Sequence, residues 1–163
     1  MIKAVIFDFD GTIIDTETAW YKVFKDAYQK YGVDLSLTTY SQCLGTNLHT
    51  FNPYTHLSTH HAIPIDLDEF RAMILQNYEK LIEQESMRPG ILNLLQEAKA
   101  AGLKIGLASS SHRDWIDKFV EKLSIRDYFE CYCTADTVTK VKPDPELYLQ
   151  ALEQLGVKSN EAI

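Results

Sequence analysis

The sequence has little cysteine and no paired cysteine spacing. Cys43, Cys131 and Cys133 are the only cysteines among 163 residues, and they form no CxxC pair. An odd set without such spacing argues against a disulfide framework or a zinc site, so we expect reduced thiols. We interpret Cys131 and Cys133 as packing residues on opposite sides of a strand.

Long apolar runs and clusters of positive charge are also missing. No window approaches the roughly 18 apolar residues of a membrane span. The apolar stretch at the N-terminus is too short for a signal peptide and runs directly into aspartates. The net charge is −7, and no lysine or arginine run offsets it. We therefore expect a cytoplasmic protein with no nucleic-acid and no membrane partner.

The apolar patterns that are present predict strands alternating with helices. Unalternated apolar runs predict buried strands, and steps of three and four predict amphipathic helices, including one with Trp115, Ile116 and Phe119 on its apolar stripe. From residue 88 the order is helix, strand, helix, strand, helix. Such alternation implies right-handed crossovers and a parallel sheet. We predict an α/β fold with a Rossmann-like, three-layer α/β/α core.

The segment between the first two predicted strands is too long to be a simple connection. Residues 16–87 carry mostly helical patterns, so we expect them to form an inserted helical domain. The α/β core would then consist of residues 1–15 and 88–163.

Polar side chains follow each predicted strand of the core. Asp8 and Asp10 follow the first strand, the serine cluster Ser109 to Ser111 follows the second, and Lys142 follows the third. Ligands of open parallel sheets bind beyond the carboxyl ends of the strands. We expect these residues to share one site.

The stretch FDFDGTIIDTE, residues 7–17, contains the two carboxylates. Asp8 can attack phosphorus and ligate a cation, while Asp10, displaced by the turn at Gly11, can act as general acid and then general base. A phosphate dianion repels carboxylates, so the chemistry needs a cation, and Mg²⁺ prefers oxygen ligands such as those of Asp8 and Asp10. The alternative is that both aspartates only cap a turn.

The other candidate residues would bind the phosphate group. Ser109 and Ser110 lie where a strand meets a helix, and a hydroxyl beside helix N-terminal amides can bind an anion; the alternative is ordinary helix capping. Lys142 can neutralise the nucleophile and the transferring group. Its alternatives are a solvated loop lysine, or Lys140 in its place.

Three histidines form a separate candidate cluster. His56, His60 and His61 have a spacing that can bind a metal ion if the segment is helical. No acidic partner accompanies them, and Pro64 follows closely. A transition-metal site is therefore only an alternative.

Taken together, the clusters resemble the motifs of the haloacid dehalogenase-like hydrolase superfamily. DFDGTIIDTE resembles the first motif, LASSS the second and KPDPELY the third, in the order of the family. The helical insert resembles the small cap of the β-phosphoglucomutase and phosphoglycolate phosphatase branch. The resemblance covers nearly the whole chain.

This resemblance implies a role for each matched residue. Asp8 would be the nucleophile that forms an aspartyl phosphate, and Asp10 the acid/base. Ser109 would hold phosphoryl oxygens, and Lys142 would stabilise the charge of the nucleophile and the phosphate. We expect a magnesium-dependent phosphatase of a small phosphorylated metabolite, acting as a monomer, with a cap that closes over its substrate.

Two departures from the family pattern keep alternatives open. Mutases of this branch carry a histidine and a cap arginine where this chain has Trp20 and Leu48, although His49 or Arg71 can substitute. This favours a phosphatase over a sugar phosphomutase. The fourth motif, an acidic cluster after a further strand, does not follow Ile163. We therefore expect a C-terminally truncated form with an open edge on the first strand, which could be a non-catalytic fragment or pair with another chain.

Overall fold

The polypeptide folds into two compact units in a computed structural model that describes residues 1–43 and 51–163. The core unit consists of residues 1–15 and 86–163, and the helical unit of residues 16–85. Leu48 and His49, which bear on the choice between phosphatase and mutase, lie outside the described residues. Across the described part of the chain, no helix has the length and apolarity to cross a membrane.

A parallel sheet forms the centre of the core unit, as the alternation of strands and helices predicts. Its described strands are β1 (Ala4–Phe7), β2 (Lys104–Ala108) and β3 (Cys131–Cys133), in the order β1-β2-β3. Strands β1 and β3 both pair with β2 in parallel. All three strands therefore direct their carboxyl ends to the same edge of the sheet.

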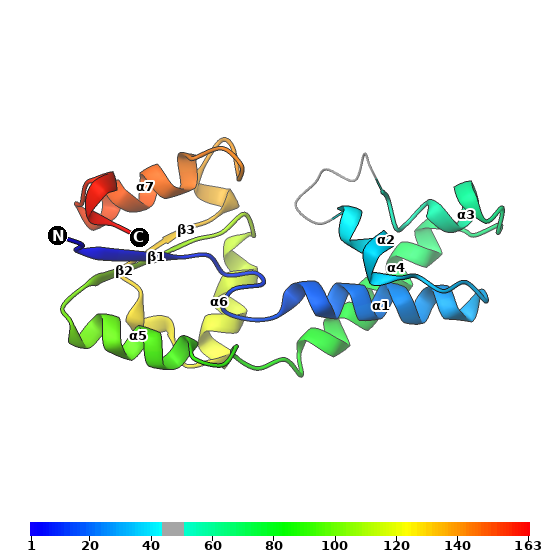
Figure 1. The fold of residues 1–163 in the computed structure, drawn as a ribbon, viewed down its shortest axis with the longest axis horizontal. Coiled ribbons are helices and arrows are strands. Elements are labelled where there is room, and N and C mark those ends of the chain that lie inside the picture. The colour runs from blue at the N-terminus through cyan, green and yellow to red at the C-terminus, as the bar shows by residue number, and fades with distance from the viewer. Residues whose placement is uncertain (44–50) are drawn as a thin grey trace. The chain divides into compact units, whose positions relative to one another are not determined.

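Helices cover both faces of this sheet, which gives the predicted three layers (Figure 1). Helices α5 (Ile91–Ala100) and α6 (Arg113–Lys122) lie on one face, and α7 (Glu146–Leu155) lies on the other. Gly106 in β2 permits the close approach of α7, because a Cβ there would lie 3.1 Å from Leu155 Cδ1. Burial on both faces explains why the strand sequences are apolar without alternation.

The two strand cysteines face the same side of the sheet, so the expectation of opposite sides was wrong. Cys131 and Cys133 both belong to the buried cluster that contacts Leu147, Ala151 and Leu155 of α7. Side chains two positions apart on a strand point in the same direction, which explains the result.

The outer edge of β1 is hydrogen-bonded, and the prediction of an open edge was wrong for this part of the strand. Lys3 N donates to Glu161 O at 2.7 Å, and Ile6 N donates to Ile163 O at 2.8 Å. Ile163 N in turn donates to Ala4 O at 3.1 Å. Residues 161–163 thus run parallel to β1 and occupy backbone groups that an edge strand would otherwise expose.

The helical unit is built on the pairing of its two long helices, α1 (Thr16–Lys30) and α4 (Leu67–Ile82). Two short helices, α2 (Leu37–Tyr40) and α3 (His56–His60), complete its described part. Aromatic side chains fill its interior: the Trp20 and Tyr78 rings stack with centroids 3.7 Å apart. Such ring pairs add to the apolar burial that stabilises a small helical unit.

The two chain segments that lead to the helical unit are joined within the core unit. Ile14 pairs with Met87 in an antiparallel bridge, and Arg88 N donates to Ile13 O at 2.8 Å. The Arg88 guanidinium also lies 3.3 Å from the Asp15 carboxylate. These contacts hold both connections at one point of the core unit.

Candidate functional site

A tight turn after β1 places two carboxylates at the carboxyl edge of the sheet. Phe9 is fully buried, and its carbonyl accepts hydrogen bonds from Thr12 N and Ile13 N. Gly11 has a φ of 73°, a conformation that glycine adopts without the steric cost of a Cβ. Because Phe9 is anchored in the core, Asp8 and Asp10 on either side of it remain at the surface of the turn.

Asp8 is paired with Lys142, so these two predicted site residues lie in contact. The Lys142 ammonium lies 2.7 Å from Asp8 Oδ1 and donates to Ala108 O at 2.9 Å. It also lies 5.1 Å from the centroid of the Tyr148 ring. The side chains of Asp8 and Lys142 keep 38% and 23% of their surface exposed, so a ligand can reach the pair. A lysine held by three groups is not a freely solvated loop lysine.

Asp10 contacts the loop between β2 and α6. Its Oδ2 accepts hydrogen bonds from Ser111 Oγ at 2.6 Å and from Ser109 Oγ at 3.2 Å. Its Oδ1 accepts one from Trp115 Nε1 at 3.1 Å. The two carboxylates therefore have different surroundings, an ammonium for Asp8 and neutral donors for Asp10. Such a difference suits two carboxylates with two roles.

The four predicted catalytic residues therefore lie together as two contacting pairs, Asp8 with Lys142 and Asp10 with Ser109. Ala108 links the pairs, because its carbonyl accepts a hydrogen bond from Lys142 and it directly precedes Ser109 in the chain. Ser109 is buried, and its hydroxyl also accepts a hydrogen bond from Ser111 N at 3.0 Å. Ser110, a predicted phosphate ligand, is exposed.

Two residues that contact Asp10 were given no catalytic or binding role from the sequence. Ser111 was grouped only with the serine cluster after the second strand, and Trp115 only with the apolar stripe of its helix. The serine cluster was a usable signal, because any of its hydroxyls could reach the first motif. The helical period of Trp115 gave no indication of a polar contact.

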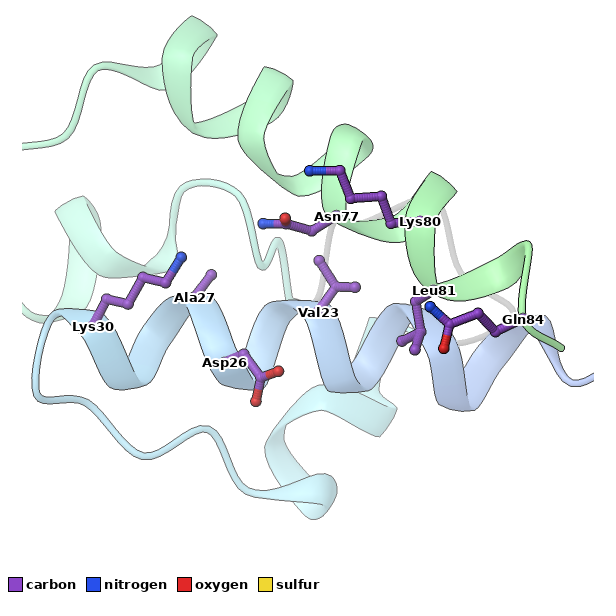
Figure 2. A pocket seen from close by; sticks show the side chains of 8 residues that line it. All are labelled: Val23, Asp26, Ala27, Lys30, Asn77, Lys80, Leu81 and Gln84. Atoms are coloured by element: carbon purple, nitrogen blue, oxygen red, sulfur yellow. The ribbon is translucent and has the colours of Figure 1, made fainter.

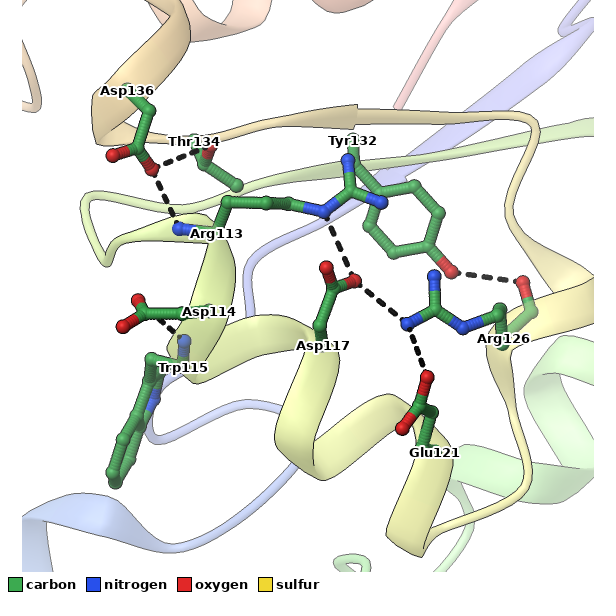
Figure 3. A network of polar contacts seen from close by, with 9 residues as sticks. All are labelled: Arg113, Asp114, Trp115, Asp117, Glu121, Arg126, Tyr132, Thr134 and Asp136. Atoms are coloured by element: carbon green, nitrogen blue, oxygen red, sulfur yellow. Dashed lines mark hydrogen bonds and ion pairs between the residues drawn. The ribbon is translucent and has the colours of Figure 1, made fainter.

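An ion-pair network fixes α6 against β3 (Figure 3). Asp117 accepts hydrogen bonds from Arg113 Nε at 3.0 Å and Arg126 Nη2 at 2.8 Å, and the Arg113 guanidinium lies 4.5 Å above the Tyr132 ring. Burial alone would raise the pKa of Asp117, but the hydrogen bonds from the two arginines outweigh it and lower that pKa. Figure 3 shows the Trp115 ring pointing away from this network. The network fixes the helix that carries Trp115.

A second clamp holds the first turn of α6. Asp136 accepts hydrogen bonds from His112 Nδ1 at 2.8 Å and from Arg113 N at 2.6 Å. The hydrogen bond from His112, and after it the one from the Arg113 backbone, lowers the pKa of Asp136 to about 2. The same hydrogen bond and the charge of Asp136 raise the pKa of His112.

The raised pKa of His112 predicts that the contribution of this histidine to stability is lost as the pH rises above about 6.5. The stabilisation from protonated His112 is complete below the unfolded-state pKa of about 6.5 and is lost as the pH rises through the higher folded-state pKa. The Asp136 contribution is present above about pH 3.9 and is lost only as the pH falls toward 2. Urea unfolding at pH 5.5 and pH 8 should show a smaller pH difference for His112→Gln than for the wild type. His60→Gln in the helical unit is the control, and parallel profiles for His112→Gln and wild type would contradict the prediction.

A groove lies within the helical unit, between α1 and α4 (Figure 2). Its volume is about 330 Å³. It is lined by apolar and polar side chains, namely Val23, Asp26, Ala27, Lys30, Asn77, Lys80, Leu81 and Gln84. None of the predicted catalytic residues is among them, since those residues belong to the core unit.

Among the described residues, no group of three or more histidine, cysteine, aspartate or glutamate side chains is arranged to bind a metal ion. The rings of His56 and His60 lie with centroids 4.2 Å apart, yet with His61 they do not form such a site. Magnesium needs fewer protein ligands than such a cluster provides, because it often binds one or two carboxylates, water and a substrate phosphate. Asp8 fits this requirement, since its exposed carboxylate uses Oδ1 for Lys142 and for Phe9 N.

Comparison with known proteins places this site in a wider context. A sequence model described as "Haloacid dehalogenase-like hydrolase" matches residues 5–163. The Bacillus subtilis (strain 168) protein named "Putative phosphatase YhcW" is 40% identical over 163 residues, which span all of this chain and 74% of that protein. The Thermotoga maritima "Phosphorylated carbohydrates phosphatase" is 26% identical over 172 residues, which span 99% of this chain and 74% of that protein.

A solved structure shares the fold at similar coverage. It is named "Crystal structure of putative beta-phosphoglucomutase from Thermotoga maritima" and superposes with a TM-score of 0.80 at 26% identity. The match covers 99% of this chain and 74% of that one. The relatives thus include proteins named for phosphate hydrolysis and one named for phosphate transfer between positions of a sugar.

Proposed function

The chain belongs to the haloacid dehalogenase-like hydrolase family, as its three motifs indicated, and we propose that it is a magnesium-dependent phosphatase of a small phosphorylated metabolite, with a phosphorylated sugar as the preferred class. The observation that carries the proposal is the 2.7 Å ion pair between Asp8 and Lys142 at the carboxyl edge of the sheet. The names of its relatives, a phosphatase of phosphorylated carbohydrates among them, support this substrate class.

In the first half of the reaction, an oxygen of Asp8 attacks phosphorus and the bond from phosphorus to the leaving oxygen breaks. Asp10 gives its proton to that oxygen, and an alcohol departs. The Lys142 ammonium neutralises negative charge on Asp8 and on the phosphoryl group. Ser110 is a proposed hydroxyl ligand of the phosphoryl oxygens, and Ser109 would join it by turning its single hydroxyl proton from Asp10 Oδ2 to the phosphoryl group.

In the second half, water replaces the alcohol. Asp10, now a carboxylate, takes a proton from the water while the water oxygen bonds to phosphorus. The bond between Asp8 and phosphorus breaks, and inorganic phosphate leaves. The acid and base of the two steps are the same side chain, which restores the starting state.

Magnesium would be held by the Asp8 carboxylate and by the backbone carbonyl of Asp10, because hydrogen bonds from Ser109, Ser111 and Trp115 orient the Asp10 carboxylate toward the loop after β2 and toward α6. When bound, the ion supplies positive charge that lets a carboxylate approach a phosphate dianion. The helical unit is the proposed cap, which would exclude bulk water and select the substrate.

A sugar phosphomutase is the second candidate, and the similarity to the Thermotoga maritima structure named as a β-phosphoglucomutase favours it. Trp20, at the position where mutases carry histidine, stacks on Tyr78 and has no acid or base to offer. The two activities separate in one assay. A mutase isomerises a sugar monophosphate in the presence of its bisphosphate, whereas a phosphatase only releases phosphate.

The test of the proposal is phosphate release from p-nitrophenyl phosphate and from a panel of sugar phosphates. We expect turnover with magnesium, loss of turnover to background in EDTA, and recovery when magnesium is restored. No phosphate release from any substrate with magnesium present would contradict the proposal.

A further inference from the structure

The three donors around Asp10 are distributed unevenly over its carboxylate. An ionised carboxylate offers about four lone-pair sites, two on each oxygen. The Ser109 and Ser111 hydroxyls take both sites of Oδ2, and the Trp115 indole takes one site of Oδ1. Among the described residues, the remaining site on Oδ1 receives no hydrogen bond. That oxygen is the one with room for a transferable proton.

We propose that Trp115 is a positioning residue for the reaction. It orients Oδ1 of Asp10, the oxygen that gives a proton to the leaving group and later takes a proton from water. The inference rests on the proposed phosphatase function and adds the atom that transfers the proton. A carboxylate held only at Oδ2 can still swing its other oxygen about that point through coupled changes of χ1 and χ2. A second contact at Oδ1, 3.1 Å from Trp115 Nε1, limits that movement.

The surroundings of Trp115 make it suitable for this task. Its ring lies against Phe119, with centroids 4.6 Å apart, and Phe119 is fully buried. The first turn of α6 is tied to Asp136, and its next turn to Arg126 through Asp117. An indole on a fixed helix has little freedom, so its N–H points at a constant place. Precise orientation of a reacting group is worth large rate factors.

The leaving group separates this role from a merely structural one. An alkoxide from a sugar phosphate needs a proton to depart, whereas p-nitrophenolate departs without one. Trp115→Phe keeps an aromatic ring on Phe119 and removes the N–H. Hydrolysis of the phosphorylated Asp8 needs Asp10 with either substrate, so the comparison uses kcat/KM, which covers only the steps up to departure of the leaving group. We expect the ratio of kcat/KM for p-nitrophenyl phosphate to kcat/KM for a sugar phosphate to rise about 10-fold, since general acid catalysis is worth about 10²–10⁴-fold.

A double-mutant cycle identifies the partner. In an Asp10→Asn background, Trp115→Phe should cause no further loss, because the two residues act as one unit. Benzothienylalanine at position 115 provides a second variant with the shape of tryptophan and no N–H, and it should match Trp115→Phe. The indole resonance of Trp115 in a ¹⁵N spectrum should move when Asp10 becomes Asn, and that of Trp20 should not.

The outcomes are distinguishable. Equal losses of kcat/KM for both substrates, a further loss in the Asp10→Asn background, or an unmoved Trp115 resonance would each overturn the positioning role while leaving the phosphatase function in place. Absence of hydrolysis by the wild type with every substrate would overturn the proposed function and this inference with it.

Discussion

Asp8→Asn is expected to lose hydrolysis of p-nitrophenyl phosphate by about 10⁴-fold or more. A carboxamide has nearly the same shape as the carboxylate but is a poor nucleophile, and removing a covalent nucleophile is among the most damaging changes in an active site. The measurement is steady-state phosphate release at saturating magnesium, with circular dichroism and urea unfolding to show that the fold persists. We expect stability to change little, because the Asp8–Lys142 pair is partly exposed.

The control for this variant is Asp114→Asn. Asp114 is an exposed carboxylate in the first turn of α6, where its Oδ1 accepts a hydrogen bond from Trp115 N. Its removal should leave turnover within about 3-fold of wild type, since surface substitutions have small effects. Substantial turnover in a folded Asp8→Asn protein would show that another group attacks phosphorus. Trapping of a labelled phosphoryl group on wild-type protein, but not on Asp8→Asn, would identify the covalent intermediate directly.

Lys142→Met is expected to lower kcat by about 10²–10³-fold. The ammonium lies 2.7 Å from Asp8, and removing one preorganised charge-stabilising group from an active site typically costs this much. Methionine keeps most of the length of the side chain and its packing near Tyr148. Because the ammonium is positioned for the transition state, in which Asp8 and the transferring phosphoryl group come together, the loss should appear mainly in kcat.

Lys140→Met is the matched control, since Lys140 is the competing lysine two residues away. Its side chain is 72% exposed, and its ammonium lies 4.0 Å from the Asp144 carboxylate. Exposed pairs of this kind contribute about 0–1 kcal/mol, so little change in rate or stability is expected. A large loss of activity in Lys140→Met with little loss in Lys142→Met would show that Lys140, and not Lys142, stabilises the charge. That result would overturn this part of the proposed site.

The sequence alone predicted the α/β architecture of the core and grouped most of the residues that we propose for the site. A strand is recognised from a pattern of residues that are neighbours in the sequence, and the alternation of strands with helices restricts the topology to a parallel sheet. Once the strands are parallel, residues that follow them must meet at one edge, which is why Asp8, Ser109 and Lys142 could be grouped from their positions in the chain. The helical unit was also predictable, because a 70-residue insert with helical periodicity needs its own core.

Only the tertiary structure decided which donors reach Asp10. Trp115 is 105 positions away in the chain, and its apolar period describes packing without describing the direction of its indole N–H. The choice of Ser111 over Ser110 likewise depends on the path of a short loop, which places one hydroxyl inward and exposes its neighbour. The hydrogen bonds of residues 161–163 to β1 follow the same principle. Sequence patterns give the face of an element, whereas contacts between distant side chains depend on how the elements and loops pack.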